Sequence, residues 1–130
     1  MNAGILAESS ETVSDRFEAA ENRASSAALI GASDDALTQI LSRQVRAKVL
    51  AARGRHSGAE QVAQEAIALA DATDLLNVQA DAYSDLAAVL ALVGKTDQVD
   101  TALGEALGRY ERKGNIVMAE RTRLQLAELE

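Results

Sequence analysis

The sequence contains no cysteine, no proline and no tryptophan, and aromatic residues make up only 2% of its 130 residues. Without cysteine the chain can form neither a disulfide nor a thiolate metal site. Without proline it has no strong helix breaker. Alanine and leucine supply most of the apolar residues, and both are strong helix formers. The composition therefore excludes thiol chemistry and favours helices packed through small and aliphatic side chains.

Basic residues are also in short supply, and the net charge is -7. Binding to nucleic acid or to an anionic membrane surface needs a positive surface, so we expect neither as a partner. No apolar run approaches the ~20 residues of a membrane-spanning helix. The first residues, MNAGILAESSETVS, lack the basic and apolar regions of a signal peptide. We therefore expect a single soluble, cytoplasmic domain.

A repeated segment is the most informative feature of the sequence. The stretch from Ala47 to Ala66 has an echo further along the chain, from Ala87 to Ala106. The residues that recur are Ala47, Val49, Leu50, Ala51, Gly54, Glu65 and Ala66, which return as Ala87, Val89, Leu90, Ala91, Gly94, Glu105 and Ala106. The separation between Ala47 and Ala87 is thus a fixed period of the length found in helical-repeat proteins. In that architecture each unit buries one face against the next.

Apolar stripes at helical spacing predict an all-α fold of six helices. We expect one domain at 10–130, a right-handed stack of three antiparallel hairpins at about 10–53, 57–93 and 97–130, after a flexible N-terminus at 1–9. Gly54 and Gly94 are expected to end helices, and Ser33, Ser57 (in a capping box with Glu60) and Thr96 to begin them. The helix at about 73–93 is apolar on most sides and should lie in the middle of the stack.

The spacing of small residues within each unit resembles the tetratricopeptide repeat. Ala47, Ala59 and Ala66 are spaced around Gly54 in the same way as Ala87, Val99 and Ala106 around Gly94. The resemblance implies an α-solenoid in which small residues let the two helices of a repeat approach closely. The sequence departs from the family in its period, which is longer than the usual length of about 34 residues. It also has Asp71 and Glu111 where a proline usually closes the repeat.

A narrower resemblance covers three segments, SRQVRAKVLAARGRH (42–56), NVQADAYSDLAAVLALVGK (77–95) and YERKGNIVMAERTR (110–123). They look like the C-terminal helical repeats of large actinobacterial regulators, which carry a cyclase or transcription-factor output domain and a STAND-type ATPase core. No Walker A loop and no cyclase metal-binding aspartate pair occur in this sequence. The resemblance implies a docking, sensing or regulatory module that serves other domains of a parent protein.

The resemblance also implies where a partner would bind, because the first helix of each tetratricopeptide-like hairpin lines a concave face. Counting from Ala47, Ala87 and Ala127 as packed alanines, we expect a mostly polar groove. Its residues are Gln44, Lys48, Asp81, Ser84, Ala88, Arg121, Leu124 and Glu128. Such a surface suits a peptide held by a few polar contacts. The alternative is that these residues only solvate a shallow groove.

Catalysis is not expected, because no nucleophile–base pair, metal-ligand set or phosphate loop can be assembled. His56, the only histidine, is interpreted as a solvated turn residue. The basic stretch around Lys48 either docks an acidic segment or compensates a helix dipole. Tyr83 and Tyr110 are expected in the core with their hydroxyl groups at its edge. We expect no catalytic residue, no cofactor and no metal.

Three functions remain open at this point. The first is a non-catalytic protein–protein interaction module, with a protein or peptide as partner. The second is a homo-oligomerisation module giving a homodimer, because Val13, Phe17 and Ala20 of the first predicted helix have no preceding repeat to cover them. The third is a sensor with a small effector in the groove, although ligand pockets are usually apolar and lined by aromatic residues.

Overall fold

The computed structural model describes residues 34–130, which form five α-helices and one short 3-10 helix, with no strand among them. The elements are α2 (Asp34–Ala52), α3 (His56–Asp71), α4 (Leu76–Leu92), η1 (Thr96–Gln98), α5 (Val99–Lys113) and α6 (Ile116–Glu128). The prediction of an all-helical chain is confirmed for these residues. The first helix of the hairpin predicted at about 10–53, the N-cap at Ser33 and the N-terminus 1–9 lie outside them, so the count of six helices stays a prediction.

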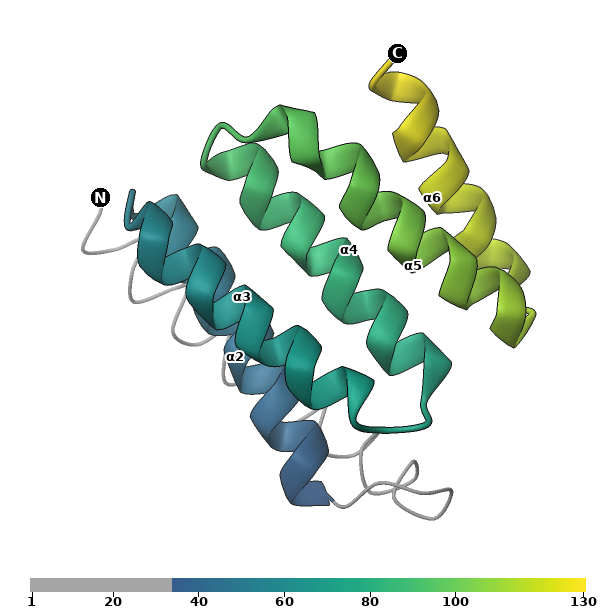
Figure 1. Ribbon diagram of the computed structural model, residues 1–130, viewed down its shortest axis with the longest axis horizontal. Helices are drawn as coiled ribbons and strands as arrows, with labels where there is room; N and C mark the ends of the chain where they lie inside the picture. The colour runs from purple at the N-terminus through teal and green to yellow at the C-terminus, as the bar shows by residue number, and fades with distance from the viewer. Residues whose placement is uncertain (1–33) are drawn as a thin grey trace, which may run out of the picture.

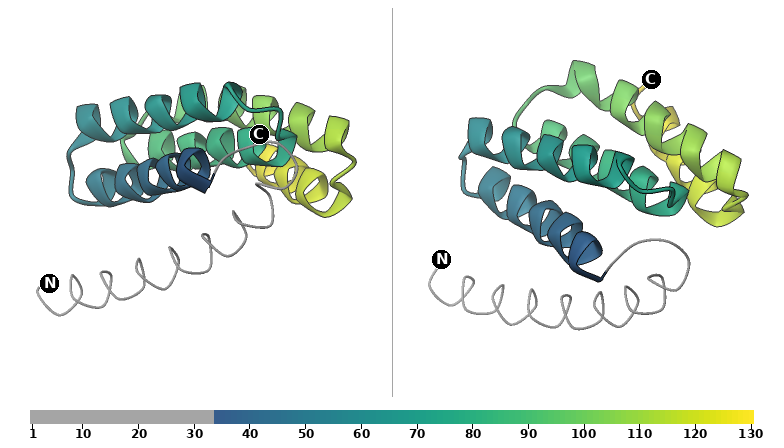
Figure 2. Two further views of the ribbon diagram at one scale, coloured as in Figure 1. Left: turned by 90° about the horizontal axis from the view of Figure 1, so that it is seen from below. Right: turned by 60° about the horizontal axis from the view of Figure 1, so that its bottom comes forward.

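The helices lie in two layers. In Figures 1 and 2, α3 and α5 form one layer, and α2, α4 and α6 form the other. The closest packing joins α2 to α3 and α4 to α5, and looser contacts join α3 to α4, α5 to α6 and α2 to α4. As its apolar circumference predicts, α4 lies in the middle of the described stack, with α2, α3 and α5 against it.

The turns after α2 and α4 depend on glycine, as predicted. Gly54 has a φ of 80° and Gly94 a φ of 86°, in the left-handed region that side chains with a Cβ atom disfavour. In each turn the residue after the glycine donates its N–H back across the helix end. Arg55 donates to the carbonyl of Leu50, and Lys95 donates to that of Leu90, both at 2.9 Å. The two turns are therefore equivalent, and they occupy equivalent positions in the sequence repeat.

The start of α3 differs from the prediction. The helix begins at His56 with Arg55 as its N-cap, without a side-chain cap, so Ser57 and Glu60 form no capping box. Because the carbonyl of Arg55 already accepts from Ala59 at 2.9 Å, the helix starts before Ser57 is reached. The residue directly after the turn glycine therefore takes the N-cap position, and an arginine side chain has no acceptor with which to cap.

The predicted start of α5 is also wrong. Thr96 does not cap this helix, since it begins η1 and α5 starts only at Val99. The glycine turn before α6, in contrast, contains a capping side chain. Asn115 follows Gly114, and its side-chain oxygen accepts from the N–H of Met118 at 3.2 Å. A side-chain cap thus occurs in a glycine turn only where the next residue carries an acceptor.

Small residues of the repeated pattern form the contact between the layers. All six positions of the pattern are buried: Ala47, Ala59, Ala66, Ala87, Val99 and Ala106. Most of them join Ile40, Leu86, Val89 and Leu103 in one core cluster that runs through α2, α3, α4 and α5. A second, smaller cluster contains Ala80, Ala106, Tyr110 and Ala119 and holds α6 to the rest of the stack. Close approach through small side chains is therefore the rule throughout the described stack.

The prediction for Ala127 is wrong, because this alanine is exposed. Ala47 and Ala87 are buried because α3 and α5 pack closely on α2 and α4, whereas α6 packs only against α5 among the described helices, and more loosely. The uncovered side of α6 also bears apolar residues. Ile116 is 80% exposed, Val117 70% and Leu124 60%. Large apolar side chains are therefore exposed on α6.

Candidate binding groove

The layer formed by α2, α4 and α6 contains a cavity of about 220 Å³. We call it the α4 cavity, because α4 supplies the largest share of its polar groups. Its lining residues are Leu41 and Gln44 from α2, Asp81, Ser84 and Asp85 from α4, Tyr110 from α5 and Met118 from α6. Side chains from four helices therefore meet at one place, although they come from distant parts of the sequence.

Tyr110 connects the core to this cavity. The residue is 1% exposed, and its hydroxyl group donates a short hydrogen bond to the carboxylate of Asp81. Burial and this hydrogen bond raise the pKa of the Tyr110 hydroxyl far above its usual value. The negative charges of Asp81 and Asp85 raise this pKa further, and the charge of Arg121 opposes them more weakly. At the tyrosine hydroxyl the surroundings are therefore acidic on balance.

Lys48 and Asp85 join α2 to α4 at the edge of the cavity. Their side-chain nitrogen and oxygen atoms lie 2.7 Å apart, and the two side chains are 37% and 27% exposed. An ion pair with this much exposure contributes about 0–1 kcal/mol to stability. It therefore contributes little to the stability of the fold.

Gln44 is the most deeply buried amide of the cavity, at 6% exposed. Its side chain makes no hydrogen bond in the part of the chain that the structure describes. Nevertheless, among these residues no fully enclosed side-chain nitrogen or oxygen lacks a partner. The amide of Gln44 must therefore reach the surface of the cavity, where both its donor and its acceptor are available.

The predicted groove residues are partly brought together. Gln44, Asp81 and Ser84 line the cavity, Lys48 pairs with Asp85 beside it, and the charge of Arg121 reaches Tyr110. The other three, Ala88, Leu124 and Glu128, are exposed and do not line it. The role of these eight residues in binding stays a prediction.

Sequence reasoning missed four of the lining residues: Leu41, Asp85, Tyr110 and Met118. The repeat period was a signal for Leu41, which occupies the position of Asp81 in the preceding repeat. Asp85 lies one helical turn after Asp81, so it shares the same face of α4. Tyr110 and Met118 gave no comparable signal. Tyr110 was expected in the core, and only the packing of α5 and α6 brings the two residues to the cavity.

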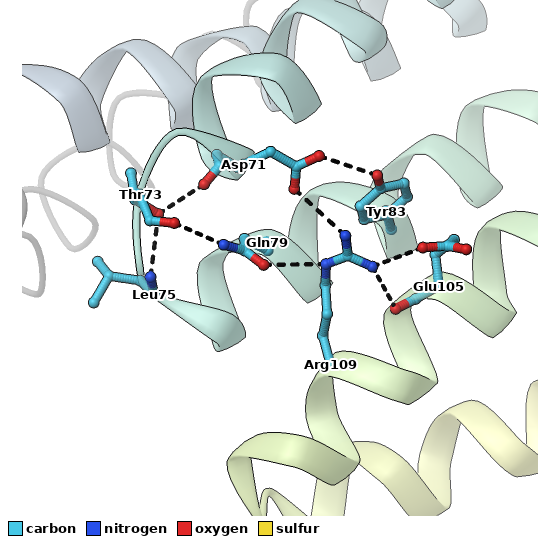
Figure 3. A network of polar contacts seen from close by, with 8 residues as sticks. Asp71, Thr73, Leu75, Gln79, Tyr83, Glu105 and Arg109 are labelled. Carbon is cyan, nitrogen blue, oxygen red and sulfur yellow. Dashed lines mark hydrogen bonds and ion pairs between the residues drawn. The ribbon is translucent and has the colours of Figure 1, made fainter.

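A second polar cluster surrounds Arg109 and is drawn in Figure 3. The guanidinium group donates to Gln79 at 3.1 Å and to the carboxylate of Glu105 at 2.8 Å, and it lies 3.6 Å from Asp71. It also stacks over the ring of Tyr83, 4.3 Å from the ring centroid. Burial lowers the pKa of Arg109, but the hydrogen bond to Glu105 and the neighbouring charges outweigh it and raise the pKa.

The neighbours of Arg109 are bound to one another as well. The hydroxyl group of Tyr83 donates to Asp71 at 3.1 Å, and the amide of Gln79 donates to the carbonyl of Thr73 at 2.7 Å. Burial, and then the charge of Asp71, raise the pKa of Tyr83. The cluster therefore ties the α3–α4 turn to α5 and fits a structural role. As predicted, both tyrosines have buried or half-buried rings with hydroxyl groups at the edge of the core.

The rest of the described surface has fewer groups that suit a binding site. A wide hollow of about 660 Å³ lies along α5 and is lined by Gly104, Glu105, Gly108, Arg109, Glu111 and Arg112. His56 is exposed at the start of α3. Among the described residues no group of three or more His, Cys, Asp or Glu side chains is placed to hold a metal ion. None of the helices between residues 34 and 130 is long and apolar enough to cross a membrane.

Comparisons of the chain with protein-family models, with curated proteins and with solved structures found no match.

Proposed function

We propose that this chain is a tetratricopeptide-like helical-repeat module that binds a segment of a partner protein on the face formed by α2, α4 and α6. The observation that carries the proposal is the α4 cavity, to which residues of all three helices contribute. The equivalent glycine turns at Gly54 and Gly94 support the repeat architecture, as do the close pairs α2–α3 and α4–α5. A docking or regulatory role within a larger signalling or transcriptional regulator follows from the narrower resemblance.

The groove combines features that suit a peptide. Ala88 is exposed one helical turn after Ser84 on α4, and Leu124 is exposed on α6, the helix that brings Met118 to the cavity. A bound segment would therefore find apolar contacts beside a few specific hydrogen-bonding groups. The cavity itself is smaller than the ~300–1,000 Å³ of typical small-molecule sites. Its size favours a single side chain of a partner protein over a whole small effector.

A pair of double variants tests this assignment. Ala88→Glu with Leu124→Glu changes two exposed residues of the predicted groove, and Gln64→Glu with Thr101→Glu makes the same change in charge on exposed residues of α3 and α5. The binding partner is first identified by capture with the unaltered chain and is then measured by calorimetry. We expect the groove variant to weaken binding at least about tenfold, about 1.4 kcal/mol, and the control to bind normally. Equal binding by both variants would place the site elsewhere.

Self-association is a second candidate function, favoured by the exposed apolar residues of α6. Ile116 and Val117 are adjacent on α6 and both are largely exposed, and clustered exposed apolar residues mark protein–protein contact sites. If two copies associate through α6, Val117→Lys should shift a concentration-dependent sedimentation profile towards the monomer. A monomer at every concentration would rule this function out.

A further inference from the structure

We propose that the α4 cavity is a subsite for one arginine side chain of the partner segment, held by the carboxylates of Asp81 and Asp85 and by the amide carbonyl of Gln44. This inference rests on the proposed function, because it specifies the chemistry of the segment that binds in the groove. It concerns a contact that neither the repeat pattern nor the charge of the whole chain indicates.

The dimensions of the cavity suit a long side chain with a polar end. Its volume is about 220 Å³, and Leu41 and Met118 contribute apolar groups from α2 and α6. The methylene groups of an arginine can pack on such groups while the charged end reaches polar atoms. The polar groups that α2 and α4 contribute lie within the same small volume, so the charged end of the side chain could reach all of them.

The charge of the cavity favours a cation. Asp81 and Asp85 are one helical turn apart on α4, so their carboxylates lie on one face and repel each other. At the hydroxyl of Tyr110 the two carboxylates act more strongly than the opposing charge of Arg121. Lys48 already occupies one side of Asp85. This exposed contact contributes only about 0–1 kcal/mol, so a guanidinium group can share or replace it.

Gln44 provides independent evidence for a ligand. Its side chain is 6% exposed, lines the cavity and makes no hydrogen bond in the described part of the chain. A buried polar group of this kind ordinarily has a hydrogen-bond partner. Here its carbonyl oxygen adds a third acceptor beside the two carboxylates, and the hydroxyl of Ser84 adds a fourth. Arginine has five donors in a planar fork and lysine only three, so arginine matches this set better.

Two small probes test the inference directly. Nα-acetyl-arginine methylamide carries the guanidinium group, and Nα-acetyl-citrulline methylamide has nearly the same shape without the charge. Each is titrated into the ¹⁵N-labelled chain while its NMR spectrum is recorded. We expect the arginine probe to shift the side-chain amide signal of Gln44 and the backbone signals of α4, with an affinity at least about tenfold above that of the citrulline probe. Equal affinities, or shifts confined to other helices, would overturn the inference.

Variants locate the contact and control for folding. Asp85→Asn removes one carboxylate charge, and Gln44→Met replaces the amide by an apolar group of similar length. Both should weaken the arginine probe at least about threefold, whereas Asp97→Asn on the exposed η1 should not. A circular dichroism spectrum establishes that each variant is folded. If Gln44→Met is folded and binds the probe as the unaltered chain does, the inference is wrong.

Failure of this inference differs from failure of the proposed function. If the arginine probe does not bind but Ala88→Glu with Leu124→Glu still abolishes partner binding, the groove is correct and the arginine subsite is wrong. If the groove variant binds its partner normally, the proposed function is wrong, whatever the probe does.

Discussion

The hydroxyl group of Tyr110 on α5 donates a hydrogen bond to the carboxylate of Asp81 on α4, beneath the face that α2, α4 and α6 share. The ring of this tyrosine belongs to the core cluster that holds α6, while Asp81 lines the α4 cavity. One residue therefore contributes both to packing and to the polar lining of the groove. A substitution of Tyr110 in the core should therefore also affect Asp81 in the lining of the cavity.

Replacing Tyr110 by phenylalanine tests that link. The ring stays, but Asp81 loses its hydroxyl donor, and hydrogen bonds to charged groups contribute about 1.5–3 kcal/mol. We expect Tyr110→Phe to lower the free energy of unfolding by about that amount in urea denaturation. Tyr83→Phe is the matched control, since the hydroxyl of Tyr83 lies on Asp71 in a more exposed setting. An equal loss in the two variants would contradict the special role of Tyr110.

The raised pKa of Tyr110 predicts a loss of stability in alkaline solution. Tyrosine in the unfolded chain releases its proton near pH 10, whereas the folded chain retains it to higher pH. The contribution of this group is therefore complete below about pH 10 and falls above it, with a limiting slope of about 1.4 kcal/mol per pH unit. The difference in unfolding free energy between the unaltered chain and Tyr110→Phe, measured from about pH 8 to 11, should shrink only above pH 10. A difference that stays constant would refute this prediction.

Arg109 should be more important for stability than other arginines. Its side chain is 16% exposed and binds Gln79 and Glu105 while stacking on Tyr83. Arg109→Leu leaves the part-buried amide oxygen of Gln79 without its donor and removes the stacking on Tyr83, so we expect a loss of about 1–3 kcal/mol in unfolding free energy. Arg46→Leu changes an exposed arginine on α2 and should alter stability by less than about 0.5 kcal/mol. Chemical denaturation of both variants measures the two losses in unfolding free energy. Equal losses would contradict a special role of Arg109.

Two glycine substitutions should change stability in opposite directions. Gly104 lies within α5, and an added Cβ atom would meet nothing within 4 Å. Gly104→Ala should therefore stabilise the chain by about 0.5–1 kcal/mol, by limiting the unfolded state and favouring the helix. Gly94→Ala has equal space but a φ of 86°, so it should destabilise the chain by about 1–2 kcal/mol. Thermal unfolding measures both, and a change of the same sign in the two variants would contradict the argument.

Much of the described fold could be predicted from local patterns. The glycines after α2 and α4 and the small residues at Ala47, Ala59 and Ala66 identify helix ends and buried faces, because both depend on short-range spacing. The first residues of α3 and α5 could not be placed in this way. There the hydrogen bonds of the turns, and not a capping side chain, determine where the helix begins.

The candidate site was only partly predictable. Gln44 and Asp81 could be placed by counting along the repeat, but the contact of Tyr110 with Asp81 joins distant positions and depends on how α4 packs on α5. At Ala127 the repeat pattern predicts a buried residue, but this alanine is exposed. Its position in the pattern matches that of buried alanines, but burial requires a neighbouring helix, and α6 packs only loosely, against α5, among the described helices.

The single-sided packing of α6 has a consequence for motion. Only Ala119 and Thr122 of this helix are buried, whereas α4 buries six residues among three neighbours. Local opening follows the density of such contacts, so amide hydrogens of α6 should exchange with solvent well before those of α4. The groove then has one rigid wall and one compliant wall. A partner segment would find the acidic positions of α4 already fixed, while α6 could adjust to its length and shape.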